Sequence, residues 1–144
     1  MSTAFLHHIN WLAVLVATLA YFILGAIWYS ALFGKKWIAY HNIDVSDPNA
    51  KKGMAGIMVA SFLLMAVSVT CLAILRARME LADNVLHTVG AGLRWGLLTG
   101  AGFAAAAISI GYLYTKKHIG LHLIDGLFHI CGYVAAMVIL CMMH

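Results

Sequence analysis

The stretch that decides the fold is the last hydrophobic segment, GLHLIDGLFHICGYVAAMVILCM, which spans Gly120–Met142. It is apolar enough to lie in a membrane, yet it contains two histidines and an aspartate. On a helix that turns about 100° per residue, its polar and small residues and the histidine just before it share one narrow stripe. These residues are His118, His122, Asp125, His129, Gly132 and Ala136. We expect the stripe to face protein or water and the other faces to contact lipid.

The composition assigns the whole chain to the membrane. Of its 144 residues, 64% are hydrophobic and 10% are charged, and the mean hydropathy is +0.93. A soluble domain of this size carries about 25% charged residues. We therefore predict an all-α integral membrane protein, a single domain over residues 1–144 that folds as a four-helix bundle. The expected spans are about 10–30, 54–75, 92–114 and 120–142.

The basic residues suggest an orientation and exclude nucleic acid as the expected partner. The net charge is +4, and six lysines lie in the first and third loops: Lys35, Lys36, Lys51, Lys52, Lys116 and Lys117. The other side holds only Arg76, Arg78 and Arg94. By the positive-inside rule, the first and third loops face the cytoplasm and both termini lie outside. The expected partner is the lipid bilayer of a plasma membrane.

Local signals refine the loops. Asp47-Pro48 is typical of a helix start, and Arg76–His87 is expected to be the second loop, with a short amphipathic turn around Leu81, Val85 and Leu86. Aromatic residues near the span ends are expected to anchor the chain at the membrane interfaces. They are Trp11, Trp28, Tyr29, Trp37 and Trp95.

The third span carries small residues at every fourth position: Gly92, Gly96, Gly100 and Ala104. Such a ridge allows two helix backbones to approach closely. Since one bundle cannot bury every small-residue face, the ridge predicts a homo-oligomer. Arg94 lies on the same span, and it is either an interfacial residue or a buried cation that pairs with Glu80, Asp83 or a ligand.

Three segments resemble the opening of the bacterial membrane family called domain of unknown function 1761. They are Asn10–Ala17, Leu24–Ser30 and Leu32–Trp37, and Leu121–His129 resembles the family's fourth span. The resemblance implies four spans in a bacterial inner membrane and no established activity. Two positions depart from the family's pattern, because Asp125 stands where Asn is expected and His122 replaces an apolar or aromatic residue.

The polar stripe has a structural interpretation. Asp125 and His129 lie four residues apart and could bond each other, or Tyr21, Ser61 or Ser109 on neighbouring helices. Interhelical bonds of this kind contribute about 0.6 kcal/mol on average in membranes. In this interpretation the protein is a structural or accessory membrane subunit.

Two further interpretations remain open. His118, His122, Asp125 and His129 could form a proton or cation path through a homo-oligomer, with steps of about 5 Å. Alternatively, a transition metal could bind two of His122, Asp125 and His129 together with ligands from another helix. The sequence has no nucleophile–base pair, CxxC pair or phosphate-binding loop, so we predict no enzyme, no catalytic residue and no cofactor beyond such a metal ion.

Overall fold

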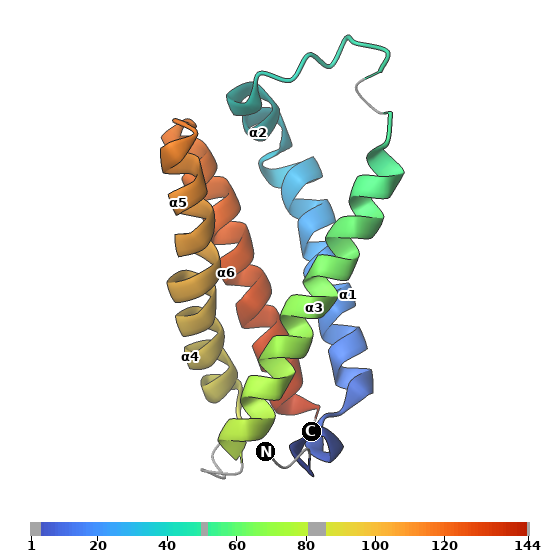
Figure 1. The fold of residues 1–144 in the computed structure, drawn as a ribbon, viewed down its shortest axis with the longest axis vertical. Coiled ribbons are helices and arrows are strands. Elements are labelled where there is room, and N and C mark those ends of the chain that lie inside the picture. Colours follow the sequence, from blue (N-terminus) through green and yellow to red (C-terminus); the bar gives the residue numbers. More distant parts are fainter. Residues whose placement is uncertain (1–3, 50–51, 81–85, 144) are drawn as a thin grey trace.

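The computed structural model describes residues 4–49, 52–80 and 86–143, and within these ranges all regular structure is helical. Four rods are long and apolar enough to cross a membrane: Trp11–Leu32, Met54–Glu80, Val89–Tyr114 and Ile119–Met142. Both termini lie at one end of the bundle, and α2 lies at the other end (Figure 1). The predicted all-α membrane bundle is confirmed.

The first rod consists of two helical elements and is flanked by two more. A 3-10 turn, η1 (Ala4–His8), precedes α1 (Trp11–Ile27), a π turn, η2 (Trp28–Leu32), and the short helix α2 (Gly34–His41). The Asn10 side chain caps α1 by accepting from the backbone N–H groups of Leu12 and Ala13 at 3.0 and 3.2 Å. At Gly34, an added Cβ would collide with the carbonyl oxygen of Tyr29, so only glycine allows this close turn into α2.

The second rod, α3 (Met54–Glu80), corrects two predictions. It does not begin at Asp47-Pro48, because the Asp47 carboxylate accepts from the backbone N–H of Asn49 at 2.8 Å within a turn, and Gly53 then adopts a positive φ of 81°. The helix also continues past Arg76 to Glu80, so the first part of the expected second loop is helical. The amphipathic turn expected around Leu81 and Val85 lies outside the described residues.

The third rod consists of α4 (Val89–Thr99), the π turn η3 (Gly100–Ala105) and α5 (Ala106–Tyr114), and the fourth is α6 (Ile119–Met142). The glycine ridge of α4 and η3 lies directly on the backbone of α6. A Cβ added to Gly96 would be 2.5 Å from Val134 Cα, and one added to Gly92 would be 2.6 Å from Val138 Cα. The ridge therefore has its close partner within the chain, and the argument from it for a homo-oligomer no longer holds.

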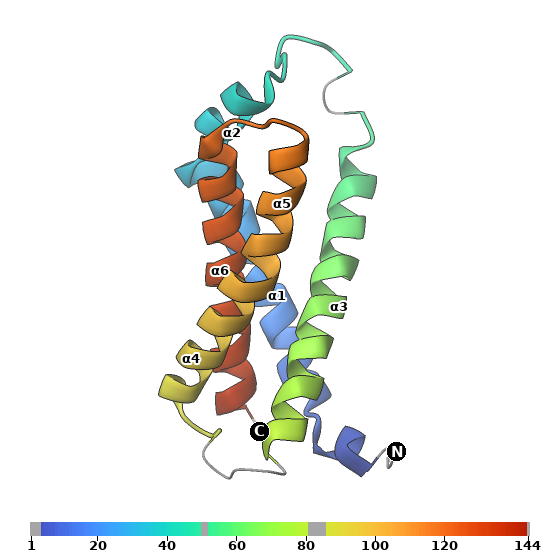
Figure 2. The ribbon, with the colours of Figure 1, turned by 60° about the vertical axis from the view of Figure 1, so that its left-hand side comes forward.

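The second rod is the most loosely packed. α3 packs on α1, α6 and η1, and it diverges from α5 toward its N-terminal end (Figure 1), where Figure 2 shows it standing apart from α6 as well. Large apolar side chains in that half, such as Ile57 and Leu64, are exposed to the surrounding lipid. Arg94 is also exposed, with its Nε–H directed to the carbonyl oxygen of Gly90 at 3.2 Å, as the interfacial interpretation expects.

The close approach of α4 to α6 predicts the effect of one methyl group. Gly96→Ala should lower the stability of the bundle by about 1–3 kcal/mol, because the new Cβ would overlap backbone atoms that cannot rotate away. The measurement is thermal unfolding of the purified protein in detergent micelles. Gly111→Ala is the matched control, since a Cβ there meets nothing within 4 Å. An equal melting temperature for both variants would contradict the packing described here.

Candidate functional site: a tyrosine-bonded carboxyl group

The stripe residue Asp125 links three helical rods. Its side chain is buried in the second turn of α6 and is only 5% exposed. Tyr29 of η2 donates to Oδ1 at 2.6 Å, and Tyr112 of α5 donates to Oδ2 at 2.5 Å. Both carboxyl oxygens thus accept a hydrogen bond, which offsets the cost of removing the group from water.

His129 lies one turn further along α6. Its Nδ1 is hydrogen-bonded to the hydroxyl group of Tyr21, which is one of the partners expected from the sequence. The Tyr21 ring is 1% exposed and lies directly against Gly132, where any Cβ would overlap the ring. The small-residue continuation of the stripe therefore receives an aromatic ring from α1 in the same chain. The hydrogen bond between Asp125 and His129 that the sequence allowed is replaced by these tyrosine contacts.

Trp28 was expected to anchor the membrane interface, and its position is different. Its ring is 9% exposed, and Nε1–H donates to the carbonyl oxygen of Ile124 at 3.0 Å. The indole group thus joins η2 to α6 beside Asp125, because a buried N–H needs an acceptor and this backbone carbonyl provides one. Trp11, at the first turn of α1, is 57% exposed, whereas Trp95 is partly buried against the core.

The π turn η3 determines which residue of α5 reaches Asp125. Gly100 faces α6, since a Cβ there would be 2.9 Å from Ile130 Cα. On an uninterrupted α-helix, Tyr112 would point about 120° away from Gly100, at 100° per residue. A π turn accommodates one extra residue, which reduces this difference to about 20°. Because of η3, Ala105 rather than Ala104 continues the ridge, with a 3.6 Å contact to a Cβ placed on Gly126.

The two stripe residues nearest α2, His122 and His118, are less buried than Asp125. His122 is half-buried and packs edge-on against Tyr112, with 5.4 Å between ring centroids. His118 is exposed and lies outside the bundle interior. It caps α6 by accepting from the N–H of Gly120 at 3.0 Å, and its ring stacks on Tyr40 of α2 at 4.1 Å.

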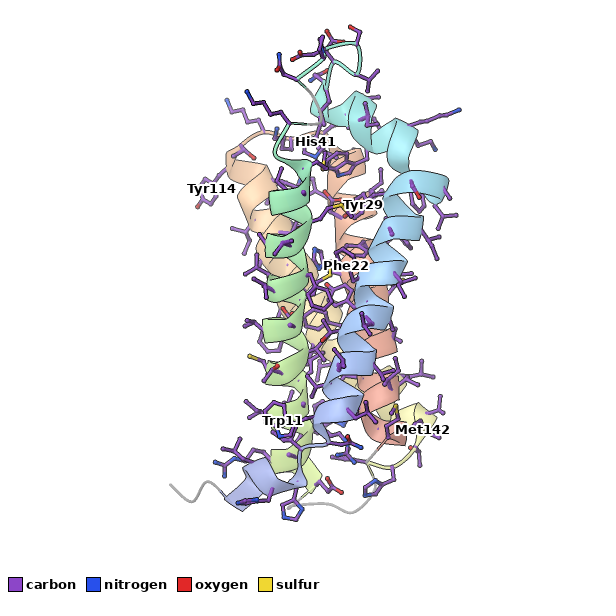
Figure 3. The ribbon with its side chains drawn as sticks, turned by 90° about the vertical axis from the view of Figure 1, so that its right-hand side faces the viewer. Trp11, Phe22, Tyr29, His41, Tyr114 and Met142 are labelled. Atoms are coloured by element: carbon purple, nitrogen blue, oxygen red, sulfur yellow. The ribbon has the colours of Figure 1, made fainter. Side chains whose placement is uncertain are left out.

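The short helix α2 packs on η2 and on α6, the two elements that carry Tyr29 and Asp125. The Trp37 ring lies 5.6 Å from that of Tyr29 and 4.3 Å from that of His41, so aromatic contacts connect α2 to a donor of Asp125. Figure 3 shows Tyr29 directed into the bundle and His41 near the end of the rods. The Nε2 atom of His41 is buried without a hydrogen-bond partner. Burial lowers the pKa of His41, and the neighbouring Lys117 lowers that pKa further, while Asp125 acts in the opposite direction.

The arrangement gives the metal interpretation no support. In the part of the chain that the structure describes, no group of three or more His, Cys, Asp or Glu side chains is placed to hold a metal ion. His122, Asp125 and His129 are each engaged with tyrosines instead. A metal ion in the membrane would need three or four converging ligands.

Sequence reasoning missed the two tyrosines that donate to Asp125. Tyr29 was expected at the interface, and Tyr112, near the end of the expected span 92–114, was not among the candidate residues. One signal pointed to the second of them: Tyr112 and Asp125 lie on either side of the short loop 115–118, so an antiparallel hairpin places them about 6 Å apart along the helix axes, at 1.5 Å per residue, which a tyrosine side chain can span. A second network was also missed, in which Arg76, Glu80 and His87 bond one another at the opposite end of the bundle.

Removing either tyrosine hydroxyl should destabilise the bundle. Tyr29→Phe and Tyr112→Phe each leave one oxygen of a buried carboxyl group without a donor, at an expected cost of about 1–3 kcal/mol. The measurement is again thermal unfolding in detergent. Tyr114→Phe is the control, because this side chain is 87% exposed and points away from the bundle (Figure 3). If all three variants unfolded at the same temperature, the bonds to Asp125 would contribute nothing to stability.

The partly buried His41 predicts a pH dependence. Its pKa in the folded state is lowered from an ordinary value of 6.5. The unfolded chain therefore binds the proton more readily, so stability contributed by neutral His41 is present above pH 6.5 and is lost as the pH falls toward the folded-state pKa. The unfolding temperature of wild type should fall more steeply between about pH 7 and pH 5 than that of His41→Phe, which keeps the ring contact with Trp37. Parallel curves for the two proteins would show that His41 is not the responsible group.

With this geometry established, the comparisons with known proteins identify a family and no activity. No match was found among curated proteins or among solved structures. A family model described as "Protein of unknown function (DUF1761)" matches residues 12–141, nearly the whole chain, including all of the stripe and the tyrosines that bond it. The chain therefore belongs to this family of unknown function, DUF1761.

Proposed function

We propose that the protein is a structural or accessory subunit of the membrane, in which the polar stripe fastens α1 and α5 to α6 and carries no ions. The observation that supports this proposal most directly is the pair of tyrosine hydroxyl groups on Asp125. They come from two different rods, and between them they engage both oxygens of the only acidic residue in α6.

The packing around α5 explains why such a fastening is useful. None of its residues is buried, whereas α4 buries Ala91, Gly92, Gly96 and Thr99. In a bilayer the hydrophobic effect does not press helices together, because lipid tails are as apolar as the side chains. The bond from Tyr112 to Asp125 is therefore a principal attachment of α5 to α6 at this end.

The energies favour a structural role as well. Interhelical hydrogen bonds in membranes contribute about 0.6 kcal/mol on average and at most about 1.7 kcal/mol, so several of them in one place are needed to fix a helix pair. Two such bonds at Asp125, the Tyr21–His129 contact and the Trp28–Ile124 bond converge on about two turns of α6. Together they attach α6 specifically to the elements that carry Tyr21, Trp28, Tyr29 and Tyr112.

A proton path is the second candidate, and one observation favours it. Tyr112 contacts both His122 and Asp125, so titratable side chains follow one another from the α2 end into the bundle. Hydroxyl, imidazole and carboxyl groups in sequence are the components of proton relays in membranes. Replacing Asp125 with Asn or with Leu separates this candidate from the structural one.

The experiment combines stability with flux. Asp125→Asn keeps an oxygen acceptor of the same shape and should lower the unfolding temperature slightly, whereas Asp125→Leu leaves two buried tyrosine hydroxyls unpaired and should cost about 2–5 kcal/mol. Proteoliposomes containing each protein and an internal pH-sensitive dye should show no proton flux above protein-free vesicles. Asp44→Asn is the control, because this exposed residue lies outside the rods.

A clear result is expected in either direction. Proton flux in wild type and in Asp44→Asn that disappears in Asp125→Asn, without loss of the folded state, would overturn the structural proposal and establish the proton path. A large stability difference between Asp125→Asn and Asp125→Leu, together with absent flux in all samples, supports the proposed role.

A further inference from the structure

A second polar cluster lies at the end of the bundle that holds both termini. The guanidinium group of Arg76 bonds Glu80 through Nη1 at 3.1 Å and contacts Nδ1 of His87 through Nη2 at 3.2 Å. His87 in turn bonds the other oxygen of Glu80 through Nε2 at 2.9 Å. The three side chains thus form a closed ring, in which the side chain of Arg76 is only 5% exposed.

One donor of this buried arginine remains unused. The Nε atom of Arg76 is buried and has no hydrogen-bond partner. Arg76 lines a cavity of about 10 Å³ together with His8, Asn10 and Met143. A space of this size accommodates about one water molecule, and an unpaired N–H of a charged group is costly unless something accepts from it.

A larger, open pocket adjoins this cavity. Its volume is about 280 Å³, and it is lined by His7, His8, Ile9, Asn10 and Glu80. Three of these residues, His8, Ile9 and Asn10, line both spaces. The pocket is therefore lined by the Glu80 carboxylate and by imidazole groups, and it adjoins the cavity that Arg76 lines.

The position of the pocket points to the lipid headgroup layer. It lies where α1 begins and α3 ends, beside Trp11, which is 57% exposed as an interfacial tryptophan would be. From this level an apolar strip of exposed side chains runs along α1 into the membrane: Leu12, Leu15 and Leu19. These leucines lie on the exposed face of α1, opposite the buried residues Ala13, Ala17 and Tyr21, so acyl chains of the membrane contact them at this level.

The charges of the lining residues limit which ligands fit the pocket. A divalent metal is disfavoured, because the described residues contain no grouping of three metal-ligating side chains. A simple anion would meet the carboxylate of Glu80, and a simple cation would meet Arg76. A molecule that carries both an ammonium group and a phosphate can use both sides of the pocket.

We propose that this pocket binds the headgroup of a zwitterionic phospholipid such as phosphatidylethanolamine. The ammonium group contacts the carboxylate of Glu80, and the phosphate contacts His7 and His8. One water molecule in the smaller cavity links the phosphate to Nε of Arg76. The acyl chains extend from the headgroup into the membrane alongside the protein. This site is independent of the Asp125 cluster and of the structural function proposed for it.

The test uses three probes with the purified protein in detergent. They are dilauroyl phosphatidylethanolamine, dilauroyl phosphatidylglycerol and soluble phosphorylethanolamine, and retained ligand is quantified by native mass spectrometry with thermal shift alongside. His7→Ala/His8→Ala removes the phosphate contacts and leaves the Arg76–Glu80 ion pair in place. Glu80→Gln removes the ammonium partner. Lys116→Ala/Lys117→Ala is the control, since these exposed lysines lie at the opposite end.

The phosphatidylethanolamine probe should bind wild type and the lysine control with equal affinity. Both pocket variants should bind it about tenfold more weakly, as the loss of a charge-assisted contact predicts. Stronger binding of phosphatidylglycerol would overturn the zwitterionic assignment, and soluble phosphorylethanolamine binding as tightly as the lipid would overturn the lipid assignment. Unchanged affinity in the histidine variant, with its fold intact by thermal shift, would overturn the site itself.

Discussion

The structure depends on satisfying one carboxyl group in an apolar bundle. An aspartate about 9 Å along a membrane helix, at 1.5 Å per residue from its start, cannot remain without hydrogen-bond donors. Tyr29 and Tyr112 provide those donors, and this requirement determines much of what surrounds them. Tyr29 must sit at the end of the first rod, where the chain turns into α2, and Tyr112 must face α6 rather than lipid. Each condition is met by a π turn, η2 in the first rod and η3 in the third.

The close contact of α4 with α6 complements this polar attachment. Near the termini, the backbones are held together by glycines that admit Val134 and Val138 to within van der Waals contact. Near the α2 end, α5 buries no residue, and hydrogen bonding rather than close packing attaches it to α6. The third rod is thus attached to the fourth by dispersion along one half and by hydrogen bonding along the other. In a solvent of lipid tails, both mechanisms favour protein–protein contact over lipid contact.

Much of this architecture was predictable from sequence, and the misses have physical causes. Hydropathy and length predicted a bundle of four membrane helices, because the hydrocarbon core imposes both. The stripe was found by its helical period, and Tyr21 was among its expected partners. The role of Trp28 was not predictable, since a tryptophan near a span end suits lipid and core equally. The short loop 115–118 pointed to Tyr112, but the π turn that directs it toward α6 changes the register without a periodic signal. The helix start at Asp47 was misplaced because an Asx turn uses the same residue type as a cap.

The extra residue in η3 means that the orientation of α5 is stored in the number of residues in the chain rather than in their identity. Deleting one residue between Gly100 and Ala105 would convert the π turn into regular helix and leave Tyr112 facing Asp125, because the residue removed is the extra one that the turn accommodates. Inserting one residue there would instead rotate Tyr112 by about 100° toward lipid, although no residue near Asp125 had changed. A substitution at the site removes one bond, whereas a distant one-residue insertion rotates a whole face of the helix. Among chains of this architecture, length between fixed landmarks therefore carries as much information about the carboxyl group's partners as sequence identity does.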